Sequence, residues 1–284
     1  MERCAGDGPA GPLAEKTMQH PLLVAENPAA TPWRWLAAGS FAGLMLAVVL
    51  FAPARWLAAL VWQASSEQVV LAAPRGSFWQ GSAQLVFSGG AGSRDSVALP
   101  GQLNWRIRPA WNGLDLELNA DCCMQRALQA QIKPAGWSGV QLALSDSQSQ
   151  WPAGLLAGLG TPWNTVQAQG ELAASTQNFN ARWVQGQLSL TGRLQLDALQ
   201  ISSRLSTLQP MGSYRLLLQG GNPSTLDLNT LEGSLVLTGQ GQWVGQRLRF
   251  DGAASATPES VDALSNLLNI IGRRNGATAV IKVG

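Results

Sequence analysis

Histidine is the side chain best suited to proton transfer near neutral pH, and this chain contains one, His20. It precedes a long apolar segment, and every residue after that segment lacks an imidazole. The region after the apolar segment therefore holds no Ser-His-Asp or Cys-His arrangement for nucleophilic catalysis. It also holds no histidine ligand for a metal ion.

Carboxylates are the next candidates for acid and base chemistry, and those of the larger region are scattered among polar neighbours. Two of them would have to meet in space to act as an acid-base pair, and their spacing selects no pair. We expect them on solvated strand faces and loops, and we expect a protein that is not an enzyme and uses no cofactor or metal. The carboxylates considered are Asp115, Glu117, Asp121, Asp146, Asp197, Asp227 and Asp251.

Two other patterns are weak candidates for a site. The glycine-rich stretch from Ser88 to Ser96 lacks the Lys-Ser/Thr ending and the following helix of a phosphate loop, so we expect a hairpin loop. Arg273 and Arg274 could meet lipid headgroups or an acidic partner, although cations that follow a helix are ordinary complements of its dipole.

Cys122 and Cys123 are adjacent in the sequence. Neighbouring Cα atoms lie about 3.8 Å apart, which is below the usual separation of about 4.4 to 6.8 Å in a disulfide. A ring between the two cysteines would therefore be strained and labile. A redox-sensitive pair, an intermolecular bridge and a stapled or packed turn after the strand 114–118 all remain open.

A Trp-x-Gly pattern recurs four times in the same region. Because the pattern recurs on alternating sequence, we interpret it as scaffold rather than as a binding site. We expect each indole to pack at a bend and cover a bare glycine before the next strand begins. The four pairs are Trp79 and Gly81, Trp111 and Gly113, Trp137 and Gly139, and Trp243 and Gly245.

From Gly76 onward, apolar and polar residues alternate, which places one set of side chains on one face of a strand. Each run is short or broken by glycine. The fold class we predict is mainly β: a curved antiparallel sheet with one solvent-exposed face. The predicted runs cover residues 102–108, 114–118, 140–144, 187–201, 213–218, 234–237, 246–250 and 278–283.

Two helices interrupt the predicted strands. A short one is expected from Pro152 to Leu159, stopped by Gly160 and Pro162. A C-terminal one is expected to begin at Thr257, with proline at the first helical position, and to end at Gly272. Its apolar face is made by Leu264, Leu267, Leu268 and Ile271.

The apolar segment from Trp35 to Ala54 contains twenty residues without a charge. A helix of this length spans a hydrocarbon core of about 30 Å. Arginines flank both ends, and tryptophans lie where the bilayer interfaces would be. We predict an uncleaved transmembrane signal anchor, because the apolar region of a cleaved signal peptide is usually shorter, about 7 to 15 residues. The flanking residues are Trp33, Arg34, Arg55, Trp56 and Trp62.

Three regions follow from this segment. Residues 1–33 are expected to form a flexible cytoplasmic tail, residues 34–62 the transmembrane signal anchor and its flank, and residues 63–284 a periplasmic β-rich domain. The basic residues near the span are Lys16 and Arg34 before it and Arg55, with Arg75 at the margin, after it, which slightly favours a cytoplasmic N-terminus. Lysine and arginine exceed aspartate and glutamate by only two, which argues against a nucleic-acid partner.

Three stretches resemble the type II secretion system protein N family: WPAGLLAGLGTPWNTVQAQG (151–170), SRLSTLQPMGSYRLLLQGG (203–221) and LLNIIGRRNGATAVIKVG (267–284). The resemblance covers roughly Trp35 to Gly284. It implies a single-pass protein of the bacterial inner membrane that is an accessory component of the machine exporting folded proteins across the outer membrane. The implied partners are other type II secretion components, namely inner-membrane platform proteins and the secretin. The family supplies no catalytic residues.

Two functions from different classes are compatible with the sequence. The first is docking to secretion components through sheet edges and tryptophan-bearing bends. The alternative is a periplasmic lipid-binding module whose apolar sheet face forms a groove, lined by Leu188, Leu190, Leu194, Leu196 and residues 216–218. A hydrolase acting on envelope polymers is a third and weaker alternative, because histidine is missing.

Overall fold

The structure, a computed structural model, describes residues 33–245 and 247–284. The chain forms two compact units, Met1–Val48 and Val49–Gly284. His20, Cys4 and nearly all of the predicted cytoplasmic tail lie outside the described residues.

Helix α1, Trp33–Leu50, carries no charge after Arg34 and has no buried residue. It has a mean hydropathy of 1.5 and is long enough to cross a membrane. Its 18 residues extend about 27 Å at 1.5 Å per residue. The predicted helix is therefore present, but it ends at Leu50 rather than at Ala54.

The reason for the earlier end is Pro53, which has no backbone N–H to continue a helix and disfavours helical backbone before it. A second helix, α2 (Ala54–Ala64), begins after it. Ala54 is buried, and Leu57, Ala58 and Val61 contact the same core as the first strands. Residues that we expected to flank a membrane span thus form a helix of the second unit.

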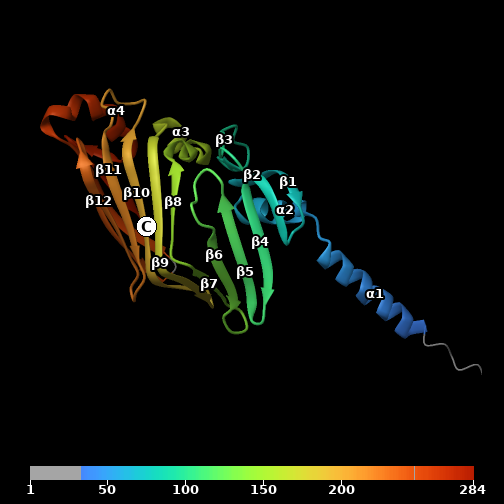
Figure 1. Ribbon diagram of the computed structural model, residues 1–284. Helices are drawn as coiled ribbons and strands as arrows, with labels where there is room; N and C mark the ends of the chain where they lie inside the picture. Colours follow the sequence, from blue (N-terminus) through green and yellow to red (C-terminus); the bar gives the residue numbers. More distant parts are fainter. Residues whose placement is uncertain (1–32, 246) are drawn as a thin grey trace, which may run out of the picture. The chain divides into compact units, whose positions relative to one another are not determined.

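One open antiparallel sheet of 16 strands dominates the second unit (Figure 1). Its order is β1-β2-β4-β5-β6-β7-β9-β10-β11-β12-β13-β14-β16-β15, with β3 paired to β2 and β8 paired to β9. The predicted fold class is confirmed. The strands are β1 Val69–Gly76, β2 Gln80–Ser88, β3 Ser96–Ala98, β4 Leu103–Ala110, β5 Gly113–Ala120, β6 Leu128–Pro134, β7 Val140–Leu144, β8 Ser147–Pro152, β9 Gln169–Val184, β10 Gln187–Ser202, β11 Gly212–Gln219, β12 Thr225–Gly233, β13 Leu235–Val244, β14 Arg247–Ala256, β15 Arg273–Asn275 and β16 Thr278–Val283.

The predicted run over residues 187–201 is confirmed as β10, which has 16 residues, and β9 before it, which the alternation did not predict, has 16 as well. Their pairing continues across a register shift between Thr191 and Arg193, opposite a bulge at Asn178 with φ of 48°. A bulge adds a residue and bends a strand without ending it.

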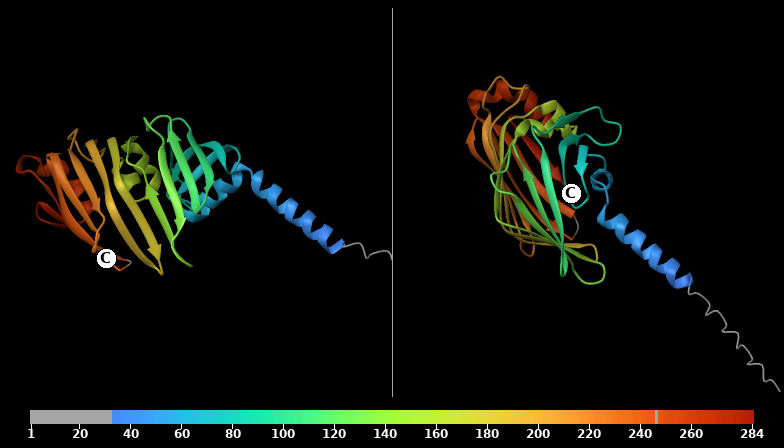
Figure 2. Two further views of the ribbon diagram at one scale, coloured as in Figure 1. Left: turned by 60° about the horizontal axis from the view of Figure 1, so that its bottom comes forward. Right: turned by 45° about the vertical axis from the view of Figure 1, so that its right-hand side comes forward.

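Helices cover one face of the sheet, which we call the inner face (Figure 2). Near the N-terminal strands, α2 and Leu155 of the 3-10 helix η1 (Ala153–Leu159) pack on Trp105 and its neighbours. Near the C-terminal strands, helix α4 (Val261–Ile271) buries Leu264, Leu267 and Leu268. The hydrophobic core lies in these two clusters.

The two predicted helices are present with local differences. The first is the 3-10 helix η1, followed by a four-residue helix α3, Trp163–Val166. The second starts with a 3-10 turn, η2 (Pro258–Ser260), and Thr257 makes no side-chain capping hydrogen bond. Gly272 has extended backbone rather than a left-handed cap, because the chain passes directly into β15.

Candidate functional site

The inner face carries apolar side chains beyond the two helix-covered clusters. Leu114, Ile132, Leu142, Ala181 and Leu190 are successive cross-strand partners on β5, β6, β7, β9 and β10. Leu194, Leu218 and Leu226 continue the row on β10, β11 and β12. We call these eight residues the inner apolar band.

The inner apolar band corrects one part of the predicted groove. Leu190, Leu194 and Leu218 belong to it, and Leu196 lies on the same face but packs against the helix-covered core. Leu217 is the partner of Gln195 and Asp227. Because side chains alternate along a strand, Leu217 lies on the opposite face. We call that opposite face the outer face.

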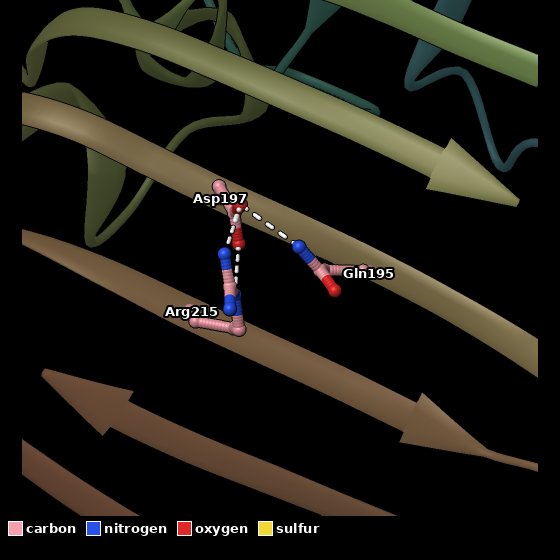
Figure 3. Close-up of polar contacts among 3 residues, drawn as sticks. All are labelled: Gln195, Asp197 and Arg215. Atoms are coloured by element: carbon pink, nitrogen blue, oxygen red, sulfur yellow. Dashed lines mark hydrogen bonds and ion pairs between the residues drawn. The ribbon is translucent and has the colours of Figure 1, made fainter. Parts of the chain in front are cut away.

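The outer face holds the best-ordered polar cluster, which joins β10 to β11 (Figure 3). Arg215 donates from Nε and Nη2 to the two carboxylate oxygens of Asp197, each at 2.8 Å. Gln195 Nε2 donates to Asp197 Oδ2 at 2.9 Å. The hydrogen bonds from Arg215 are the main cause that lowers the pKa of Asp197. A carboxylate held in its charged form by a fork of donors is a structural clamp rather than a general base.

The other predicted carboxylates are engaged separately. Asp121 accepts hydrogen bonds from the side chains of Asn104 and Asn119, each at 3.2 Å. Asp146 accepts one from the backbone N–H of Asn178 at 2.6 Å. Within the described ranges, no group of three or more His, Cys, Asp or Glu side chains could hold a metal ion.

Two pockets lie on the polar outer face, one over β1, β2, β4 and β5 and the other over β4, β5 and β6. Arg106 and Glu117 form an ion pair at 3.8 Å that borders both pockets. Both side chains are more than 40 % exposed. A pair this exposed contributes little to stability and binds no ligand by itself.

All four Trp-x-Gly pairs lie at hairpin turns, between β1 and β2, β4 and β5, β6 and β7, and β13 and β14. The expectation that each indole covers its bend was wrong for Trp111 and Trp137. Their relative exposures are 104 % and 108 %, so neither packs on anything in its own chain. Trp79, Gly81, Gly113, Gly139, Trp243 and Gly245 complete the set at these turns.

Aromatic rings do cover glycines in this sheet, but they come from other strands. The Trp105 ring lies over Gly81, and a Cβ added there would also overlap the Arg75 carbonyl oxygen. The Phe250 ring lies over Gly239, where an added Cβ would overlap the ring. Aromatic covering of a glycine on a neighbouring strand stabilises sheets. The predicted device exists, with different partners.

Cys122 and Cys123 form a disulfide in the turn between β5 and β6, with a Cα separation of 3.7 Å. Cys122 is exposed, and Cys123 is buried in the N-terminal core cluster. The Cys123 carbonyl accepts a hydrogen bond from the Gln150 N–H, which ties this turn to β8. No other described cysteine exists to exchange with this pair.

The two remaining candidate stretches are the glycine-rich residues 88–96 and the pair Arg273 and Arg274. The glycine-rich stretch connects β2 to β3, and Asn164 Nδ2 donates to Asp95 Oδ2 in it at 2.7 Å. Arg274 of β15 donates to the Gly276 carbonyl and to Asn269 Oδ1. Neither stretch assembles an anion site.

Both edges of the sheet are short or interrupted. β1 contains Pro74 and a register shift between Ala72 and Arg75. β15 has three residues, of which Arg273 and Arg274 are charged. Proline, bulges and charge are the usual protections of an edge strand against pairing with another chain. These protected edges argue against the predicted docking of a partner by addition of a strand.

A sequence model of the type II secretion system (T2SS) protein N family matches residues 67–281. This match covers most of the chain, from just before β1 to within β16. The chain belongs to the type II secretion system protein N family. No curated protein and no solved structure matches the chain. Membership of the T2SS family implies a role among secretion components, which the geometry of the sheet alone does not indicate.

Proposed function

We propose that this chain is an accessory component of the type II secretion system, anchored in the bacterial inner membrane by α1 with its sheet in the periplasm. The observation that carries the proposal is the family match over residues 67–281, together with the apolar helix α1 before it, which is long enough to span a membrane. The sheet supports export of folded proteins by docking other secretion components, and it does so without catalysis.

Three properties of the sheet support docking rather than an enzymatic role. Several carboxylates of the outer face are paired with arginine or amide donors, as Asp197 is with Arg215. The edges are protected, so partners meet faces and turns rather than adding strands. Exposed aromatic side chains at turns, such as Trp137, are of the type that dominates protein and membrane contacts.

A deletion strain complemented with the wild-type chain tests this function. Secreted hydrolases are measured in the medium and in the periplasm, and outer-membrane permeability is followed in the same cultures. The proposal expects hydrolases trapped in the periplasm of an intact envelope. Normal secretion in the deletion strain would contradict it.

A second candidate is a lipid-handling module, and the inner apolar band is the observation that favours it. Seven of its eight residues, all except Leu190, keep part of their surface exposed, and none belongs to either helix-covered cluster. A row of partly exposed apolar side chains across seven strands can accept an acyl chain.

Photo-crosslinking in cells separates the two candidates. A photoreactive amino acid replaces Leu142 in the inner apolar band, and a matched variant carries it at neighbouring Gln141, which faces the other side and hydrogen-bonds Asn180. The lipid candidate expects lipid adducts at position 142 and none at 141. Protein adducts without lipid at position 142 would reject it.

A further inference from the structure

One end of the sheet is marked by tryptophan. The turns there include those that join β1 to β2 (residues 77–79), β4 to β5 (111–112), β6 to β7 (135–139) and β9 to β10 (185–186). Three of these turns contain a tryptophan, and Trp183 is the penultimate residue of β9 before the fourth. We call Trp79, Trp111, Trp137 and Trp183 the tryptophan end.

The strand register brings these turns to the same side. Pro134 pairs with Val140, and Val140 pairs with Trp183, so the β6–β7 turn lies beside the end of β9. Leu114 pairs with Pro109 and Ile132, which aligns the β4–β5 turn with them. The β4–β5 and β6–β7 turns lie together at the lower edge of the sheet in Figure 1.

The tryptophans of this end are not part of the core. Trp111 and Trp137 are fully exposed, and Trp183 is 47 % exposed. Val140, the partner of Trp183, is also exposed, so apolar surface continues from this end into the inner apolar band. Exposed apolar side chains gathered in one place mark a contact surface.

The turns of the tryptophan end contain no charged residue. The turns at the opposite end differ, because the β2–β3 loop carries Arg94 and Asp95 and the β5–β6 turn carries Asp121 and Arg126. Uncharged turns with large indoles suit a surface that is partly apolar and partly wet.

The chain enters this unit beside the β1–β2 turn, which lies next to Ile107 in the middle of β4. Pro53 forms a β-bridge with Ser77, and the Phe78 N–H donates to the Ala52 carbonyl at 2.7 Å. Residues 52–53 follow α1 after one further residue, Phe51. The β1–β2 turn, which carries Trp79, is therefore tied to the segment that leaves the apolar helix.

We infer that the tryptophan end rests on the lipid bilayer, with the indoles of Trp111 and Trp137 in the headgroup region of the membrane that α1 spans. Tryptophan prefers this interface because its ring is apolar and its N–H seeks a polar partner. Chain entry beside the β1–β2 turn keeps these turns within reach of the membrane surface, and the absence of charge from the turns themselves lowers the cost of approaching it. The inference rests on the proposed membrane anchoring by α1.

Tryptophan fluorescence of the full chain tests this contact. The protein is reconstituted into phosphatidylethanolamine and phosphatidylglycerol vesicles that contain lipids brominated near the headgroup end of one acyl chain. Bromine quenches the tryptophans that reach it. The variant with Trp111→Phe and Trp137→Phe keeps aromatic bulk at both turns and removes two emitters. We expect it to lose quenchable fluorescence relative to wild type.

Trp163→Phe is the matched control, because Trp163 of α3 is 42 % exposed but lies near the start of β9, away from the tryptophan end. It is expected to leave the quenchable signal unchanged. If removing Trp111 and Trp137 takes away only unquenched emission, the turns do not touch lipid and the inference is overturned. Loss of secretion by that variant would then indicate a partner protein at the turns.

The double variant Trp33→Phe and Trp35→Phe tests separately whether α1 is inserted in the membrane. A fall in quenching for this pair alone means that α1 is inserted while the tryptophan end is off the membrane. A fall for Trp111 and Trp137 alone supports the contact and rejects the anchor. Circular dichroism of each variant establishes that its sheet is folded, so each result applies to the native protein.

Discussion

Asp197 and Arg215 show how a single cross-strand pair can hold two long strands in register. They face each other on β10 and β11 and meet through two hydrogen bonds of 2.8 Å. Asp197 is the more shielded partner, with 15 % of its side chain exposed against 40 % for Arg215. Opposite charges directly across a strand pair stabilise it, and their effect is largest where water is excluded.

The first prediction concerns the pH dependence of this pair. Arg215 lowers the pKa of Asp197 in the folded protein, so its contribution to stability is present above the unfolded pKa of about 3.9 and is lost as the pH falls through the folded value. We expect Asp197→Asn to lower Tm at neutral pH and to have a shrinking effect as the pH falls below about 4. Thermal unfolding followed by circular dichroism across this range measures it.

A matched control is Asp251→Asn, because Asp251 meets Lys282 at 3.6 Å and both side chains are about three-quarters exposed. A pair so exposed is expected to change Tm little at any pH. An Asp197→Asn effect that stays constant down to the lowest pH would mean that lost packing, rather than lost charge, causes it.

Helices α2 and α4 act as local covers at opposite flanks of the sheet. Each buries one apolar face: α2 through Ala54, Leu57, Ala58 and Val61, and α4 through three leucines. The outer side of α2 remains apolar too, because Trp56, Leu60 and Trp62 are exposed. The inner apolar band lies outside both helix-covered clusters and is partly exposed. This exposure is the physical basis of the lipid candidate.

The second prediction tests the cover made by α4. Leu267 is 1 % exposed in the C-terminal core cluster, whereas Ile270 of the same helix is 39 % exposed. Leu267→Ala should cost about 2 to 5 kcal/mol of unfolding free energy through lost burial and a residual cavity. Ile270→Ala should cost well under half as much. Urea unfolding of the two variants compares them, and equal losses would show that α4 does not pack as described.

At the scale of the molecule, the sheet has two unlike faces and two unlike ends. Its outer face holds charged and amide ladders, and its inner face holds the cores and the inner apolar band. One end carries uncharged, tryptophan-bearing turns, and the other carries charged loops. A component set between a membrane and other secretion proteins benefits from such polarity, because each surface can meet a different neighbour.

The third prediction concerns orientation. If α1 spans the inner membrane with its N-terminus in the cytoplasm, everything after Leu50 lies in the periplasm. Alkaline phosphatase fused after Gly284 should then be active, and a cytoplasm-dependent reporter at the same position should be inactive. The reverse pattern would overturn the orientation and, with it, the proposed place of the sheet among secretion components.

Local periodicity in the sequence was enough to predict several elements. β7 and β16 have the predicted bounds, and the apolar face of α4 contains the predicted Leu264, Leu267 and Leu268. Alternation with period two and an apolar stripe with helical period depend on neighbours in the sequence, so they can be read without a structure. The family and the apolar span could likewise be predicted from contiguous residues.

Tertiary structure alone decided which aromatic rings cover which glycines and which stay exposed. Trp105 reaches Gly81 and Phe250 reaches Gly239 across strands, whereas Trp111 and Trp137 contact nothing. The sequence pattern paired each tryptophan with the glycine two residues later, because a pattern records only short separations. Strand register sets the true partners, and it also brings the separate turns of the tryptophan end to one side of the sheet, since pairing joins residues far apart along the chain.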